Sequence, residues 1–118
     1  MSGIFNLEIE NIKDRPEKQI NLVTFKGKLD VVSSPGVAQK ILPLIDEGQL
    51  FFVFDFNSLD YIDSAGIYTI LQCYTHAKEK KGSIVLARLS SNVEEILSSI
   101  GVTKILPTYT KLEDALRA

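Results

Sequence analysis

The residues of this chain that could take part in chemistry gather around one stretch, YIDSAGI, which runs from Tyr61 to Ile67. A strongly apolar run precedes it, and a long amphipathic segment, residues 67–81, follows it. The pattern predicts a strand, a short loop and a helix, with Asp63 and Ser64 where the loop becomes the helix. Asp and Ser are preferred at helix N-caps because their side-chain oxygens accept hydrogen bonds from free backbone N–H groups. A capped helix start is therefore the simplest interpretation of this pair.

A nucleophilic role for Ser64 is the first alternative, and the sequence argues against it. A nucleophile elbow has a glycine two residues before its serine, and here that position holds Ile62. A catalytic triad needs a histidine within hydrogen-bond reach. The single histidine, His76, lies twelve residues further along the same predicted helix, and twelve helical residues span about 18 Å. A serine hydrolase is thus the least favoured hypothesis, and we expect no enzymatic activity.

Neither a metal site nor a bound cofactor is predicted. The acidic residues Glu8, Asp55, Asp60 and Asp63 occur without a second motif that would join them to a base or a metal. Cys73 is the one cysteine, so no internal disulfide can form and the soft metal ligands are too few. The glycines form no phosphate-binding loop.

Length and composition describe one ordinary domain covering residues 1–118. The chain is 45% hydrophobic and 24% charged, with a formal net charge of -2 and a pI of about 5.4. That balance argues against a nucleic-acid-binding domain, which would present a basic face. The N-terminus resembles no signal peptide, and no apolar run reaches the length of a membrane span. We therefore expect a soluble, cytoplasmic protein.

The first residues predict a pair of antiparallel strands. Residues 5–10 and 20–26 form the two strands, and a polar turn, residues 11–18 (NIKDRPEK), joins them. Residues 27–30 (GKLD) break the second strand, since Gly27 permits a backbone turn that a Cβ would resist. The side chains expected to face inward from the first strand are Phe5, Leu7 and Ile9.

Helices and strands alternate after residue 30. A serine cap and a proline at 33–35 open a helix that Pro43 should kink or end and that Gly48 terminates. The near-continuous apolar run 51–56 predicts a central strand covered on both faces. The remaining elements are a helix from Ser64 to Gly82, a strand at 83–87, a helix from a capping box at Ser91 to Gly101, a short strand at 105–106 and a helix opened by a capping box at Thr110.

This order implies an α/β fold, a small mixed sheet with two antiparallel N-terminal strands and then parallel strands, with helices packed on it. The inward-facing helix residues are expected to be Val37, Ile41, Leu44 and Ile45, then Ile67, Ile70, Leu71, Tyr74 and Ala77, then Val93, Ile96, Leu97 and Ile100, and finally Leu112, Ala115 and Leu116. Cys73 lies off this stripe, so Cys73→Ser should cost less than about 1 kcal/mol. Leu71→Ala should cost about 2–5 kcal/mol.

Ser64 can serve a role that needs no base in this chain. A serine at a helix start can be exposed and phosphorylated by another protein's kinase. The free N–H groups and the dipole of the helix N-terminus tolerate the resulting anion, so the fold can survive while the surface changes. Asp30 and Asp60, in the loops that lead to two helix starts, are expected at the same end of the sheet and to flank a partner surface with Ser64.

The stretch DSAGI, residues 63–67, resembles the phosphorylation-site motif of the anti-sigma factor antagonists, members of the STAS domain family. Residues 27–30 (GKLD) are similar to that family's Gly-Glu-Leu-Asp turn, and residues 52–62 look like its central strand and following loop. The close of the chain, with IGV at 100–102 and EDAL at 113–116, also matches the family. The motifs occur in the family's order and spacing over almost the whole chain.

The resemblance implies a small mixed sheet with helices mainly on one side. It implies that Ser64 is phosphorylated by an anti-sigma factor that is also a serine kinase and binds the ATP, and that a serine phosphatase restores the active form. The unphosphorylated protein would then bind the anti-sigma factor and free a sigma factor. The implied partner-binding residues are Asp30, Asp60, Asp63, Ser64 and Gly66, and the expected state is a monomer.

Three residues depart from the family pattern. Ala65 replaces a frequent second serine, Lys28 replaces the usual acid in the turn, and Tyr68 stands where a small residue is common. The competing hypothesis is a STAS-type scaffold or small-ligand-sensing module that phosphorylation does not regulate.

Overall fold

The computed structural model describes residues 5–15 and 18–118. Its strands form one mixed sheet in the order β1-β2-β3-β4-β5, with β1 (Asn6–Arg15) antiparallel to β2 (Lys18–Leu29). The strands β3 (Phe51–Ile62), β4 (Ser83–Ala87) and β5 (Thr108–Tyr109) each pair in parallel with the strand before them in that order. The predicted mixed sheet, with an antiparallel N-terminal pair followed by parallel strands, is confirmed.

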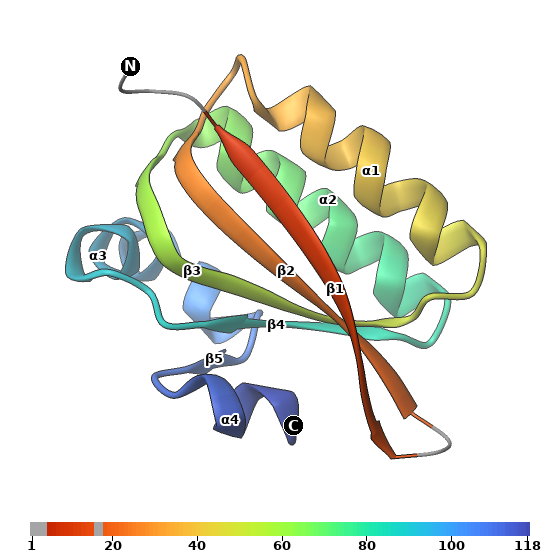
Figure 1. Cartoon of the computed structure of the whole chain (residues 1–118). Helices are drawn as coiled ribbons and strands as arrows, with labels where there is room; N and C mark the ends of the chain where they lie inside the picture. Colours follow the sequence, from red (N-terminus) through yellow and green to blue (C-terminus); the bar gives the residue numbers. More distant parts are fainter. Residues whose placement is uncertain (1–4, 16–17) are drawn as a thin grey trace.

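Helices cover both faces of the sheet unequally. The helices α1 (Ser34–Asp46) and α2 (Ser64–Glu79) lie side by side on one face, and α4 (Leu112–Leu116) lies on the other (Figure 1). The main core joins α1, α2 and α3 (Ser91–Ser99) to the sheet, whereas a smaller core lies under α4. The 3-10 turn η1 (Val102–Lys104) follows α3. Helices mainly on one face were the expectation, and the structure bears it out.

The central strand is β3, as the sequence predicts. Phe52, Phe54 and Phe56 point into the main core, and Val53 points into the smaller core on the opposite face. Alternate side chains of a strand point to opposite faces, so a strand that is apolar on both must be covered on both. This buried strand carries the chain directly to Ser64.

The N-terminal hairpin is longer than predicted. Residues 11–15 belong to β1 and not to a turn, and their partners run from Asn21 back to Lys18. Pro16, which the prediction placed in this turn, lies outside the described residues. Ile9 is 37% exposed, so it does not face inward as fully as Phe5 and Leu7, because β1 is the edge strand. Polar edge residues conceal strand character from a hydrophobic pattern.

The second strand does not break at Gly27. It runs on to Leu29 with shifts of register on both sides of residues 26–27, and Gly27 has a φ of 97°. A β-bulge accommodates such a residue without ending the strand. This extension of β2 brings its end beside Ile62, the last residue of β3.

The predicted boundaries of α1 and α3 agree with the structure only in part. Ser33 holds the N-cap position of α1, but its hydroxyl caps no helix amide, and Pro43 lies inside α1 without ending it. The cap of α3 is Ser90, whose Oγ accepts from the N–H of Val93, rather than Ser91. Gly48, with a φ of 100°, ends α1 as expected.

The C-terminal elements differ from the prediction as well. Residues 105–106 are not a strand, and β5 comes after Pro107 at Thr108–Tyr109. The cap position of α4 is Lys111, without a side-chain hydrogen bond, so Thr110 forms no capping box. The helix α2 ends at Glu79, and the left-handed residue there is Lys81, with a φ of 67°, ahead of Gly82.

Cys73 corrects the predicted face of α2. It is fully buried in the main core, together with Ile70 and Ala77, whereas Leu71 and Tyr74 are half-buried. Desolvation in the core raises the pKa of the Cys73 thiol to about 12. The helix packs against α1 and against β3 and β4 of the sheet, so its buried stripe is rotated from the one that the apolar pattern predicts.

Candidate functional site: an exposed serine at the start of α2

Ser64 is the first residue of α2, and its side chain is exposed. The strand β3 places it there, because α2 begins two residues after the strand ends at Ile62. Ile62 pairs with Leu29, the last residue of the parallel strand β2. Carboxyl ends of parallel strands meet at one edge of a sheet, so the loop that follows β2 lies beside the start of α2.

Asp63 is the N-cap of α2, as the sequence predicts. Its Oδ1 accepts a hydrogen bond from the Gly66 N–H at 3.0 Å, and its backbone carbonyl accepts one from the Ile67 N–H at 2.9 Å. Its other oxygen, Oδ2, accepts from the Val31 N–H at 3.2 Å. The Asp63 N–H itself donates to the Leu29 carbonyl at 3.2 Å. One residue therefore holds the helix start and the neighbouring loop together.

Asp30 shapes the β2–α1 loop, residues 30–33. Its Oδ1 accepts from the N–H groups of Val32 at 3.0 Å and Ser33 at 3.2 Å. The Ser33 hydroxyl donates to the Lys28 carbonyl at 2.8 Å and accepts from the Asp30 N–H. The hydrogen bond from the Ser33 backbone, followed by that from Val32, lowers the pKa of Asp30 below its usual value. This carboxylate is part of the turn.

Asp60 lies within β3 and not in a loop, which corrects its predicted setting. Its neighbours Leu59 and Tyr61 pair with the adjacent residues Gly27 and Lys28, so Asp60 is the extra residue of a bulge. Its side chain is exposed. Within the described residues no hydrogen bond joins it to Asp30, Asp63 or Ser64. It shares their end of the sheet because β2 and β3 are parallel.

Gly66 is buried beneath the site. A Cβ at this position would lie 2.5 Å from the Leu29 carbonyl oxygen and 2.9 Å from Ile62 Cγ1. The absent side chain lets the first turn of α2 pack directly on the end of β2. Gly66 therefore affects the surface through the placement of Ser64.

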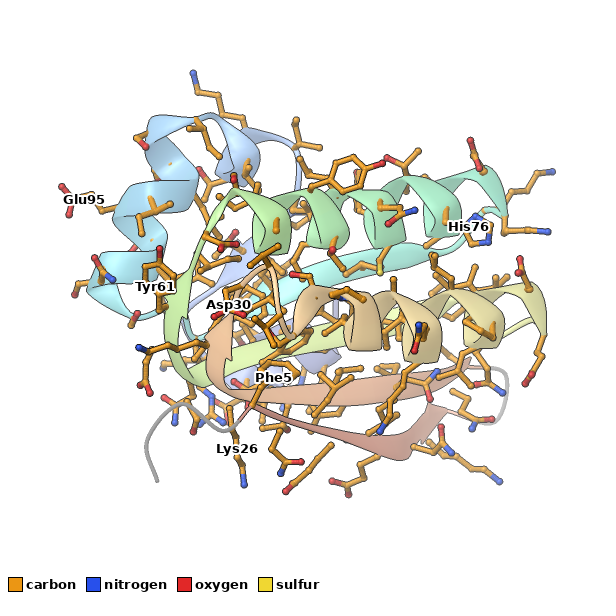
Figure 2. All side chains as sticks on the ribbon, turned by 90° about the horizontal axis from the view of Figure 1, so that it is seen from above. Phe5, Lys26, Asp30, Tyr61, His76 and Glu95 are labelled. Carbon is orange, nitrogen blue, oxygen red and sulfur yellow. The ribbon has the colours of Figure 1, made fainter. Side chains whose placement is uncertain are left out.

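Exposed apolar side chains lie around Ser64, and most of them were not predicted from the sequence. Val31 is 68% exposed, Val32 is 84% exposed and Tyr68, one helical turn after Ser64, is 66% exposed. Tyr61 at the end of β3 is 43% exposed and lies near Asp30 (Figure 2). The available signal was a pair of valines in a loop, outside any periodic stripe. Grouped exposed apolar residues of this kind mark interaction surfaces.

His76, the single histidine of the chain, does not lie near Ser64. His76 lies toward the other end of α2, where its Nε2 is 2.7 Å from Asp46 Oδ1 at the end of α1 (Figure 2). Ser64 therefore has no histidine base in this molecule. The described part of the chain also contains no group of three His, Cys, Asp or Glu side chains placed to hold a metal ion.

The remaining acidic candidates have structural partners. Asp55 is buried, and its carboxylate receives two hydrogen bonds from Arg88, Nη2 to Oδ2 at 2.6 Å and Nε to Oδ1 at 3.1 Å. Hydrogen bonding to Asp55 raises the pKa of Arg88 above its usual value. Glu8 lies 3.3 Å from Lys26 on the N-terminal hairpin. Neither carboxylate belongs to the surface around Ser64.

These features define a small α/β domain in which the start of one helix presents an exposed serine hydroxyl with exposed apolar side chains around it. Residues 11–115 match the model of the STAS domain, and the chain belongs to that family. None of the described helices is both apolar and long enough to span a membrane.

Two relatives and one solved structure illustrate the likeness. The chain is 23% identical to the anti-sigma-B factor antagonist of Bacillus subtilis over 95% of this chain and 99% of that one. It is 29% identical to the anti-sigma F factor antagonist of Paenibacillus polymyxa over 94% of this chain and 93% of that one. The structure of the Bacillus cell fate determinant SpoIIAA in the phosphorylated form matches with a TM-score of 0.70 at 19% identity, covering 97% of each chain.

Proposed function

We propose that this protein is an anti-sigma factor antagonist controlled by phosphorylation of Ser64. The unphosphorylated form binds an anti-sigma factor that is also a serine kinase, and so frees a sigma factor. Phosphorylation switches this binding off, and a serine phosphatase reverses it. The observation that carries the proposal is the exposed Ser64 hydroxyl at a helix start, beside exposed Val31, Val32 and Tyr68. The names of the two relatives support the assignment.

The kinase must supply the chemistry of the transfer. The Ser64 oxygen attacks the γ-phosphorus of ATP bound by the kinase, the bond to the β-phosphate oxygen breaks, and ADP leaves. The hydroxyl proton needs a base. Both oxygens of Asp63 already accept backbone hydrogen bonds, and His76 is at the other end of the helix. We therefore infer that the base comes from the kinase.

The proposed partner surface consists of Asp30, Asp60 and Ser64 with the exposed valines and tyrosines around them, while Asp63 and Gly66 hold this surface in place. Asp60→Ala should weaken kinase binding if this surface is correct. The protein needs no cofactor of its own for this role, and the proposed state is a monomer.

Phosphorylation should act by charge and bulk rather than by unfolding. A phosphoserine carries about -1.5 to -2 charge near neutral pH. One partner carboxylate within about 5 Å would repel it by about 3 kcal/mol per unit charge at an effective dielectric of about 20. That weakens binding about a hundredfold. The helix N-terminus stabilises the anion by about 0.3–1 kcal/mol, which preserves the fold but does not restore the complex.

The test combines recombinant anti-sigma factor kinases from the same organism with this protein and ATP. We expect a mass gain of one phosphate that maps to Ser64, is absent from Ser64→Ala, and persists in Ser91→Ala. Ser91 is the matched control because it is also an exposed serine at the first position of a helix. Ser64→Asp should fold like the parent and bind the kinase weakly, whereas Ser91→Asp should bind normally.

Ser64→Ala should bind the kinase and resist release by ATP. Equal affinity of the phosphorylated and unphosphorylated forms at moderate salt would reject the switch. That result would instead favour a STAS-type scaffold or ligand-sensing module.

A further inference from the structure

Two carboxylates act on the β2–α1 loop in different ways. The hydrogen bonds of Asp30 to Val32 and Ser33 stay within residues 30–33 and give the loop its local shape. Asp63 reaches the loop from another part of the chain, through the 3.2 Å bond from the Val31 N–H to its Oδ2. Of these two carboxylates, only Asp63 attaches the loop to the start of α2.

The attachment matters because of what the loop carries. Val31 and Val32 are 68% and 84% exposed, so little packing of their side chains holds them in place. The Val31 backbone amide is bonded to the carboxylate next to Ser64. A bond from a charged acceptor is stronger than a neutral one. A loop fixed in this way does not have to be ordered when a partner binds, which avoids a cost in binding free energy.

The cap and the attachment use different oxygens of one side chain. Oδ1 caps the helix through the Gly66 N–H, and Oδ2 accepts from Val31. Asparagine can keep a carbonyl oxygen on Gly66, but it then presents an NH₂ group to the Val31 N–H. Serine has one oxygen and caps helices as well as aspartate does. Both substitutions therefore keep the helix cap at Gly66 and remove the acceptor for the Val31 N–H.

We propose that Asp63 is a positioning residue that fixes Val31 and Val32 against the N-terminus of α2, so that the kinase meets the two valines and Ser64 as one preformed surface. This assignment rests on the proposed function for its partner. It gives Asp63 a role through the loop, where direct contact with the kinase was the expectation.

The experiment compares Asp63→Asn and Asp63→Ser with the parent and with Glu95→Gln. Glu95 is the charge control, an exposed carboxylate on α3 that points away from the molecule at the same end as Asp30 and Tyr61 (Figure 2). Backbone ¹⁵N relaxation of the free proteins gives order parameters for the loop and for α2. Titration calorimetry with the unmodified kinase then gives the affinity of each variant.

Both Asp63 variants should keep α2 and melt within about 5 °C of the parent. The order parameters of Val31 and Val32 should fall from about 0.85 to below about 0.6, while those of α2 stay unchanged. Affinity for the kinase should fall about tenfold or more, the size expected for loss of a charged hydrogen bond. Glu95→Gln should change neither quantity.

Three results would overturn the assignment. The loop could stay ordered in both variants, which denies the attachment. The loop could become mobile with unchanged affinity, which denies its importance. Affinity could fall while the loop stays ordered, which makes Asp63 a direct contact. If the parent itself binds no anti-sigma factor kinase, the proposed function fails, and the relaxation measurement still decides whether Asp63 holds the loop.

Discussion

Alanine at Gly66 tests the close packing that places the serine. The new Cβ would lie 2.5 Å from the Leu29 carbonyl oxygen and 2.9 Å from the side chains of Leu29 and Ile62. Separations under about 3.0 Å are not found between such atoms, so α2 must move away from the end of β2. The Leu29 carbonyl also accepts the Asp63 N–H bond at 3.2 Å, which this movement would strain.

The expected cost follows from three effects. Overpacking costs about 1–3 kcal/mol, and a lost backbone hydrogen bond adds about 0.5–1.5 kcal/mol. Replacement of a helical glycine by alanine returns about 1 kcal/mol. Gly66→Ala should therefore lower the free energy of unfolding by about 0.5–3.5 kcal/mol, because the clash involves backbone and cannot be relieved by rotating one side chain.

Urea denaturation followed by circular dichroism measures this change. The matched control is Gly36→Ala, since Gly36 is the third residue of α1 just as Gly66 is the third residue of α2. No atom outside the local helix lies within 4 Å of a Cβ at Gly36, so this variant should gain up to about 1 kcal/mol. The two variants should thus shift the midpoint in opposite directions. A midpoint for Gly66→Ala at or above that of the parent would refute the reasoning.

Four further predictions concern the core and the charges. Cys73→Ser should cost about 1–3 kcal/mol in urea denaturation, because it buries an unpaired hydroxyl. The native thiol should resist a disulfide reagent at pH 8, since burial raises its pKa to about 12. Rapid labelling of the folded protein would contradict this burial of the thiol. Leu71→Ala should cost about 1–2 kcal/mol, less than for a fully buried leucine, because Leu71 is half-buried. Arg88→Ala leaves the buried Asp55 carboxylate without its charged partner, with only the hydrogen bond from the Asn57 N–H. It should cost about 2–4 kcal/mol, below the fully buried case because Arg88 is 37% exposed. Adding Asp55→Asn should recover part of the loss, and no recovery would argue against the pair. The pKa of Asp30 is lowered, so this group gives stability that is present above its unfolded pKa and is lost as the pH falls through its folded pKa. Asp30→Asn should therefore flatten the acid side of a curve of stability against pH. An unchanged slope would count against the hydrogen bonds of the loop.

Interactions between residues close in sequence could be predicted well. The cap of α2 at Asp63 joins residues three apart, and the end of α1 at Gly48 depends on one local backbone conformation. The buried strand β3 is apolar enough to need cover on both faces. Such features depend on side-chain type and spacing alone, so they can be derived before any tertiary contact is known.

Boundaries set by strand pairing could not be predicted. Residues 11–15 are mostly polar and become strand because β2 lies beside them. Gly27 stays within a strand because a bulge absorbs it. The predicted face of α2 was also wrong at Cys73, since packing against α1 and the sheet decides which residues of α2 are buried.

The functional site also has features that the sequence predicts and features that depend on tertiary contacts. The sequence by itself determined that a serine follows a helix cap, and hence that its hydroxyl sits at the start of α2. Only the tertiary structure decided what surrounds that hydroxyl. The Val31–Asp63 bond joins residues 32 positions apart, and it exists because two parallel strands end at the same edge of the sheet. The register of that pairing depends on bulges in β2 and β3, which arise from packing across the whole sheet and leave no periodic trace in the sequence.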